Sequence, residues 1–576
     1  MTARARALLA VGLAMVVVLV LAVPHAVHAE TSAGARRAFV LLVPGVTLDD
    51  LLRVPDVAAF ARTGGAGWMS PELDVRSVRQ LAPPITQRGP DPGNVGVTIL
   101  APNGHDPAVL EHALEIIRSD LSSGSSPKPM VVVIVGASGS LAMETAKDDL
   151  RPVVVATGQG PDLFASGGSV GTITSDSTRR IGVVAANDVE ATIDAFLGHS
   201  TAGDAGHAIR IVREAPPFHL HDRYVAMRRM TIPVQTTAAL YVTIAGLFAV
   251  LVLWLGRRAP AVLGVLASGF AISVGPLAAA LLAAGHLPSL SYATVVPFVI
   301  GVTVVLVVLV LLGAQGEGVM HPILPLAVVL LAFLLVEDLL GWTAALTPFL
   351  GGSELDGGRF FGLPNVFIGL LLGAGLYAAA RLPVWAGFAV LVGAALLAGL
   401  PLAGANLGGA VTLFAAAGLW LPLRMRGRLR VPELAFAALV CVIGTGVVLV
   451  AHRFSSLPTH VTSFEETRGA GGAWSTFVDR LAVGWHLIEH NPFALVPVVG
   501  MVVTLAVVLR PPASIGPSLA RHPAWRDALL VLLLSSVVAY VVNDSGPAAC
   551  GVGFGMALGG LLYVSVAERT WKMAPV

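Results

Sequence analysis

Acidic, basic and amide side chains gather in a glycine-rich stretch at residues 351–365, between two apolar segments long enough to cross a bilayer. Arg359 is the leading candidate there, because a guanidinium can bind a phosphate or carboxylate through two parallel hydrogen bonds. Asp356 is placed to position it, and Asp544 lies in another short loop between apolar segments. These three are candidate catalytic residues. An internal ion pair that only locks the loop is an equally good interpretation of Arg359.

Further polar residues near the same loops are candidates for ligand binding. Ionisable groups beside membrane spans are costly, so they usually have a partner or a function. The residues that we single out are Glu354, Asn365, Asn543, Ser545 and Asp338. The alternative is that they are ordinary residues of water-exposed loops, an interpretation that applies equally to the polar segment at residues 453–491.

Two short patterns have the spacing of metal ligands. His486, Glu489 and His490 follow the H-x-x-E-H order of a zinc peptidase helix, which places both histidines on one face. No third ligand is evident, and Pro492 interrupts the helix at once. The second pattern, at residues 219–222, is short and fits an interfacial segment better. We therefore predict no metal site and no cofactor.

The composition is that of an integral membrane protein. Hydrophobic residues make up 55% of the 576-residue chain and charged residues only 12%, whereas soluble proteins average about 25% charged residues. The mean hydropathy is +0.80. A net charge of +1 gives no reason to expect a nucleic-acid partner. Both cysteines, Cys441 and Cys550, lie in apolar segments, so no disulfide is expected in a soluble domain.

Residues 1–29 resemble a secretory signal. Arg4 and Arg6 precede an apolar run at residues 8–23, and residues 27–29 form a small-residue cleavage site. An uncleaved signal anchor is the alternative. In both cases the segment that follows is expected outside the cytoplasm.

Residues 30–215 have the pattern of a soluble α/β domain. Apolar, β-branched runs at residues 38–43, 130–135 and 153–156 are typical of parallel strands. Helices are expected over residues 48–62 with Thr47 as cap, from Asp106 to Leu121, and from a cap at Asn187 or Asp188 to Leu197, ended by Gly198. Strands that alternate with helices predict a mostly parallel sheet covered on both faces.

The rest of the chain is predicted to be a membrane bundle. Residues 216–233 mix arginines with apolar residues and are expected to form a juxtamembrane linker along the membrane surface. Residues 234–576 predict a polytopic transmembrane domain of about eleven helices. The expected spans are residues 235–255, 260–284, 290–313, 322–341, 363–380, 384–403, 406–423, 432–452, 492–510, 527–543 and 546–566.

Loop charges predict how this bundle is oriented. With the N-terminal domain outside, arginines and lysines concentrate in the cytoplasmic loops, most densely at residues 424–430. Cytoplasmic loops of membrane proteins carry this excess. The sequence thus predicts a multi-pass protein of the plasma membrane, with an extracytoplasmic N-terminal domain and with residues 351–365 on the outer face. The lipid bilayer is its first expected partner.

Several stretches resemble known sequences, in the same order and over most of the chain. Four are similar to the opening and the later part of alkaline-phosphatase-superfamily domains: residues 40–51, 65–70, 174–184 and 187–193. Residues 356–365 and 543–546 resemble membrane motifs of bacterial proteins that join such a domain to a many-helix bundle. The resemblance implies an alkaline-phosphatase-like fold for the N-terminal domain.

The chain departs from that family where catalysis would need it. Active members resemble one another in placing a metal-binding Asp directly after the first strand, where this chain has Pro44-Gly45. No Ser or Thr nucleophile is evident between Ser70 and Thr98, and residues 136–139 replace an Asp-His pair. A two-metal phosphoryl-transfer site requires carboxylate and imidazole ligands. The resemblance therefore implies a catalytically silent domain, in which Asp188 fits the family pattern or is simply a helix cap.

These observations favour an integral membrane protein of the cell envelope. Its N-terminal domain would bind or present an envelope lipid or polymer component to the outer face of the bundle. One alternative is a membrane-embedded transferase that acts on a lipid-linked or phosphorylated substrate through Arg359, Asp356 and Asp544. A transporter is another, although no clear internal repeat is visible. A scaffold for envelope assembly, which would tolerate loss of any single polar residue, is the third.

Overall fold

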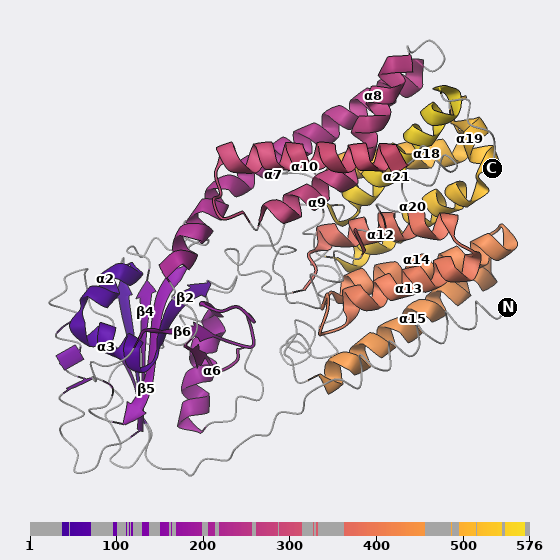
Figure 1. Ribbon diagram of the computed structural model, residues 1–576. Coiled ribbons are helices and arrows are strands. Elements are labelled where there is room, and N and C mark those ends of the chain that lie inside the picture. The colour runs from indigo at the N-terminus through magenta and orange to yellow at the C-terminus, as the bar shows by residue number, and fades with distance from the viewer. Residues whose placement is uncertain are drawn as a thin grey trace.

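The computed structural model consists of an N-terminal α/β domain and a helical bundle, and one long helix leads from the domain into the bundle (Figure 1). The parts of the chain that it describes are residues 37–44, 47–70, 96–100, 129–137, 150–159, 169–198, 206–213, 218–255, 261–285, 287–313, 362–455, 495–513, 515–543 and 548–570, with single residues between them.

The N-terminal domain is built on an 8-stranded mixed sheet. Its strands are β1 (Arg37–Pro44), β2 (Gly65–Ser70), β3 (Gly96–Leu100), β4 (Pro129–Ala137), β5 (Arg151–Gln159), β6 (Gly171–Thr174), β7 (Val183–Ala185) and β8 (Arg210–Val212). The order is β3-β1-β4-β5-β2-β6-β8, with β7 paired to β2. Both edges of the sheet are therefore short strands.

The sheet is less parallel than the sequence predicts. Strand β5 contains the run 153–156, expected to be parallel, and it pairs antiparallel with both β4 and β2. Strand β8 is also antiparallel to β6. An apolar run indicates that both faces of a strand are buried, and an antiparallel strand in the middle of a covered sheet meets the same condition. The mixed direction thus replaces the mostly parallel expectation.

Helices cover both faces of this sheet (Figure 1). On β4, Met130, Val132 and Ile134 join the buried cluster of α2 (Leu48–Arg53) and α3 (Pro55–Thr63). The alternate valines of β4 pack with α6 (Ala186–Leu197). This alternation explains why the strand is apolar without interruption.

Capping residues in the sequence predict some helix ends of this domain correctly, and the structure corrects two other predictions. The Thr47 cap is confirmed, because its side chain and that of Asp50 form a capping box. Gly198 ends α6 in the left-handed conformation, as expected. The single helix expected over residues 48–62 is two, however, because Pro55 holds Val54 extended. The cap of α6 is Ala185 rather than Asn187 or Asp188.

The bundle begins with α7 (Phe218–Leu255), a continuous helix that passes through Pro233. The segment expected as a separate linker at residues 216–233 is thus, from Phe218 on, the first part of this helix. Eleven helices follow in the described residues: α8 (Ala261–Ile272), α9 (Val274–Ala284), α10 (Tyr292–Gly313), α12 (Asn365–Arg381), α13 (Val384–Gly399), α14 (Leu407–Arg426), α15 (Val431–Phe454), α18 (Leu495–Leu509), the short α19 (Gly516–Arg521), α20 (Pro523–Val542) and α21 (Ala548–Thr570).

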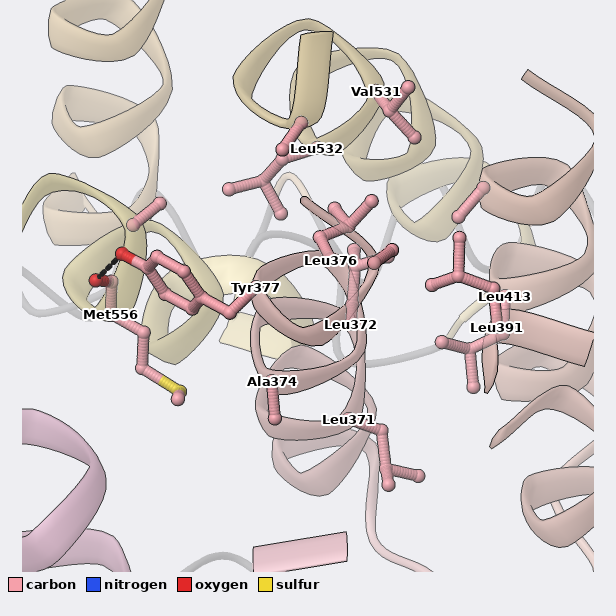
Figure 2. Close-up of a cluster of buried hydrophobic side chains, with 14 of the residues drawn as sticks. Leu371, Leu372, Ala374, Leu376, Tyr377, Leu391, Leu413, Val531, Leu532 and Met556 are labelled. Carbon is pink, nitrogen blue, oxygen red and sulfur yellow. Dashed lines mark hydrogen bonds between the residues drawn. The ribbon is translucent and has the colours of Figure 1, made fainter. Parts of the chain in front are cut away.

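Helix α12 is the centre of the bundle. Every one of its residues from Phe367 to Ala379 is buried. Figure 2 shows Leu372 and Leu376 of this helix among side chains of α13, α14 and α20, while the Tyr377 hydroxyl donates a hydrogen bond to the Met556 carbonyl of α21. A helix that is apolar on all sides belongs in such an interior.

Apolar helices at the periphery indicate a membrane-embedded protein. Four described helices are long and apolar enough to cross a bilayer: Tyr292–Val310, Leu407–Arg426, Val431–Phe454 and Pro523–Val542. Within the first and third, large apolar side chains such as Val304 and Val442 are more than half exposed. The total of about eleven spans stays a prediction, since residues 322–341 lie largely outside the described residues.

One expected span is interrupted. Residues 260–284 form two helices, α8 and α9, that meet at the buried Ser273. Pro276 has no amide hydrogen to donate to the carbonyl of Ile272, which breaks the helical ladder. At the same break, the Ser273 hydroxyl donates to the Phe270 carbonyl at 2.5 Å.

Candidate functional site

The structure describes two of the sequence-predicted site residues, Asn365 and Asn543. The other candidates lie outside the described residues: Arg359, Asp356, Asp544, Glu354, Ser545 and Asp338. Asn365 is the first residue of α12, and Asn543 is the C-cap of α20. Each therefore stands where the chain passes between a helix and one of the candidate loops.

A third asparagine, Asn406, ties the start of α12 to the start of α14. Its Nδ2 donates both hydrogens, to the Leu363 carbonyl at 2.8 Å and to Asn365 Oδ1 at 2.8 Å. Its Oδ1 accepts from the Gly409 amide at 2.8 Å and so caps α14. Asn406 is only 3% exposed. Its amide hydrogens are committed to structure, so it acts as a support for neighbouring groups.

Asn543 packs against the same first turn of α14. Its Nδ2 donates to the Ala539 carbonyl at 3.1 Å and to Thr412 Oγ1 at 3.4 Å. The approach requires a glycine opposite, because a Cβ at Gly408 would lie 2.5 Å from Asn543 Oδ1. Asn365 and Asn543, which are far apart in sequence, thus both pack at the start of α14. We call Asn365, Asn406, Thr412 and Asn543 the asparagine cluster.

The connection between α13 and α14, residues 400–406, is held by backbone hydrogen bonds from most of its amides. The Gly404 amide donates to the Leu397 carbonyl and the Asn406 amide to the Ala398 carbonyl, both at 2.8 Å. The buried His452 of α15 contacts the Gly399 carbonyl through Nε2 at 2.9 Å. These bonds satisfy carbonyls that a helix end leaves without partners.

The same connection reaches the start of α12. The Gly404 carbonyl accepts from the Leu363 amide at 2.7 Å. Gly362, with φ +80°, allows the close approach, because a Cβ there would lie 2.2 Å from the Gly404 carbonyl oxygen. The 400–406 connection and the asparagine cluster therefore form one hydrogen-bonded unit.

The N-terminal domain contacts this unit through Arg179. Its Nη1 donates to the Pro401 carbonyl at 3.1 Å. Burial lowers the pKa of Arg179 to about 10, with Asp176 opposing the shift, so the guanidinium stays charged at neutral pH. Ala405 is 3% exposed and belongs to the buried apolar cluster of the domain. Side chains from both partners thus close the interface.

Asp188, which the family resemblance singled out, supports the turn that carries Arg179. Its carboxylate accepts from Ser175 Oγ at 2.5 Å, from the Ala185 amide at 2.7 Å and from the His207 amide at 2.9 Å. Burial raises the pKa of Asp188, and these hydrogen bonds oppose the shift. The contacts are those of a structural carboxylate in the first turn of α6, which bonds back to the amide of the Ala185 cap.

The described part of the chain contains no cluster of potential metal ligands. No group of three or more His, Cys, Asp or Glu residues that could hold a metal occurs there. His219, His221 and Asp222 belong to the first turns of α7, and residues 486–490 lie outside the described residues.

The opposite end of α14 has a different character, because ion pairs gather there. Arg424 donates to Asp527 of α20 at 2.7 Å, and its guanidinium lies 5.6 Å from the Trp420 ring centroid. Arg426 donates to Glu433 at 2.7 Å. The bundle therefore has an amide-rich end beside the N-terminal domain and an arginine-rich end away from it.

Sequence reasoning missed the residues that organise the first end. Asn406 has a recognisable signal, since an asparagine directly before an apolar helical run favours an N-cap. Arg179 and His452 have none, because their partners are backbone carbonyls distant in sequence. No family model matches the chain, and no curated protein or solved structure matches it.

Proposed function

We propose that this chain is an integral membrane protein of the cell envelope. Its N-terminal domain, outside the cytoplasm and without catalytic activity, binds or presents an envelope component to the adjoining end of the helical bundle. The component is a lipid or polymer with an anionic group.

The contact between Arg179 and Pro401 carries the proposal. It joins the N-terminal domain to the 400–406 connection, and that connection is bonded to the starts of α12 and α14. A ligand presented by the domain would therefore meet the asparagine cluster first. A domain that only tethered the bundle would have no need to meet this end.

The proposed binding groups adjoin the cluster in sequence. Arg359 lies shortly before Asn365, and Asp544 directly follows Asn543. Since Asn365 and Asn543 both pack at the start of α14, the two candidate loops leave the bundle from the same end. A guanidinium there suits a phosphate or carboxylate headgroup.

Charge supports the proposed orientation. The end of α14 away from the N-terminal domain carries Arg424 and Arg426, followed by Arg428 and Arg430. An excess of arginine marks the cytoplasmic side. The asparagine cluster, at the other end of the same helix, is then on the outer face.

Native mass spectrometry of the full chain, released from nanodiscs of mixed phosphatidylglycerol and phosphatidylcholine or from its own membranes, tests this function. We expect an anionic lipid-linked component to stay bound through gentle release. Arg359→Ala should lower its retention about ten-fold, the loss of one charge-assisted bidentate contact. The matched control is Arg453→Ala, an exposed arginine at the same end of the bundle. Equal retention in wild type and both variants would contradict the proposal.

The transferase alternative has one observation in its favour. Helices α12 and α14 both begin beside the asparagine cluster, and helix N-termini attract anionic groups such as phosphate. In this alternative Arg359, Asp356 and Asp544 would act on the bound group. A component retained by Arg359→Ala at wild-type level, yet no longer converted to a product of different mass, would favour the transferase over a presenting protein.

A further inference from the structure

The turn that carries Arg179 is rigid. Residues 175–182 are fixed by the Thr178 hydroxyl, which donates to the Val183 carbonyl at 2.6 Å, and by the Arg179 amide, which donates to the Ser175 carbonyl at 2.8 Å. The Gly182 amide adds a bond to the Ile173 carbonyl at 2.7 Å. A turn held in this way presents the guanidinium in one place.

Both sides of the interface carry a residue in an unfavourable backbone conformation. Arg179 has φ +53° and Ala405 has φ +45°, and they are the only non-glycine residues with positive φ in the described part of the chain. A Cβ makes this region costly, and glycine is the residue that adopts it easily. Glycine would relieve the strain at both positions but would lack the contact, which the side chain of Arg179 or Ala405 makes. Such strain persists where the surrounding structure imposes it, often at functional sites.

The contact continues into the asparagine cluster. Pro401 and Ala405 lie in the same short connection as Asn406, whose side chain bonds Leu363 and Asn365. The amides of Ala403, Gly404, Ala405 and Asn406 all donate backbone hydrogen bonds, so we expect a displacement at Pro401 to move Asn406 with it.

We propose that Arg179 and Ala405 form a latch that couples the N-terminal domain to the asparagine cluster. Arg179 is a positioning residue: it holds the 400–406 connection and thereby the start of α12, from which the Arg359 loop departs. The role of the latch rests on the proposed function: a component bound to the N-terminal domain would change the site in the bundle through this contact. Coupling between two sites is reciprocal, so occupancy of the bundle site would tighten the latch in turn.

Hydrogen exchange read by mass spectrometry on the full chain in nanodiscs, without added ligand, tests the latch. Arg179→Gly removes the side chain and also relieves the backbone strain of its own turn. We expect the amides of Gly404, Asn406 and Gly409 to exchange about ten-fold faster, while β4 keeps its protection. Arg179→Lys, which can still donate to the Pro401 carbonyl, should restore most of the protection.

The reverse experiment changes the bundle side of the interface and measures hydrogen exchange in the N-terminal domain. Ala405→Gly should speed exchange at the amides of Arg179 and Gly182, which lie in a different domain from the substitution. Arg53→Ala is the matched control, because its side chain is 79% exposed and pairs only locally with Asp50. It should change neither region.

Unchanged exchange at residues 404–409 in Arg179→Gly, with unchanged exchange at the 175–182 turn in Ala405→Gly, would overturn the latch. This outcome is independent of ligand retention, which tests the proposed function. The two proposals can therefore fail separately.

Discussion

A single amide side chain, that of Asn406, joins the starts of two helices of the bundle, α12 and α14. It caps α14, bonds the chain before α12 and bonds Asn365 itself. Removal of one partner from such a buried set leaves the remaining groups without hydrogen bonds, which costs more than the bond itself contributes. At the residue scale, the site is therefore determined by a support residue that touches no proposed ligand.

We expect Asn406→Ala to lower the free energy of unfolding of the bundle by about 2–3 kcal/mol, from the lost cap and the two other hydrogen bonds. Ser535→Ala is the control. Its buried hydroxyl has no hydrogen-bond partner among the described residues, so its loss should change stability by less than about 0.5 kcal/mol. Reversible unfolding in mixed detergent micelles measures both. Similar values for the two variants would show that the amide network contributes little.

At the element scale, glycines let α14 and α15 pack closely. A Cβ at Gly418 would lie 2.7 Å from the Cα of Ala437, and one at Gly444 would lie 2.6 Å from the Phe414 ring. Backbone cannot yield as a flexible side chain can, so the Gly418 contact sets the distance between the helices. Since α14 begins at the asparagine cluster, its packing also fixes the site.

Gly418→Ala should therefore destabilise the bundle by about 1–3 kcal/mol through overpacking. Gly446, on the same helix pair, has open space where its Cβ would stand. Gly446→Ala should be neutral or stabilising by up to about 1 kcal/mol, because alanine favours a helix. Thermal unfolding of the two variants in the same detergent makes the comparison. A stable Gly418→Ala variant would mean that α15 can move away from α14 at little cost.

The helix ends and strand directions show how much of the fold the sequence can predict. The Thr47 cap and the Gly198 end of α6 follow from local chemistry and are confirmed. The direction of β5 does not, because burial on both faces produces one apolar pattern for parallel and antiparallel strands alike. The grouping of Asn365 with Asn543 depends on Asn406 and Gly408, which contact them only in the folded chain.

At the scale of the whole molecule, the N-terminal domain is placed to serve the bundle. Its sheet is covered on both faces, and its Arg179 turn meets the amide-rich end of the bundle. The arginine-rich end is the far one. This polarity supports the proposal that the N-terminal domain and the asparagine cluster share one side of the membrane.

We expect the full chain, purified in detergent, to hold less than about 0.1 equivalent of zinc or manganese and to hydrolyse neither phosphate monoesters nor diesters. The reason is that a two-metal phosphoryl-transfer site needs carboxylate and imidazole ligands, and this chain has Pro44-Gly45 and residues 136–139 where the resembling family has them. Elemental analysis beside a hydrolysis assay checks this. Stoichiometric metal with turnover would make the protein a membrane-tethered hydrolase or transferase.

Labelling with a membrane-impermeant maleimide tests the central claim, that the N-terminal domain and the asparagine cluster share the outer face. Two cysteine probes, Arg53→Cys in α2 and Arg428→Cys after α14, are placed in a Cys441→Ala background, in which the one remaining native cysteine, Cys550, is buried. Both probe positions are exposed. We expect intact cells to label Arg53→Cys, and Arg428→Cys to label only after permeabilisation. Labelling of Arg428→Cys in intact cells, with Arg53→Cys protected, would place the N-terminal domain in the cytoplasm and contradict the proposed topology.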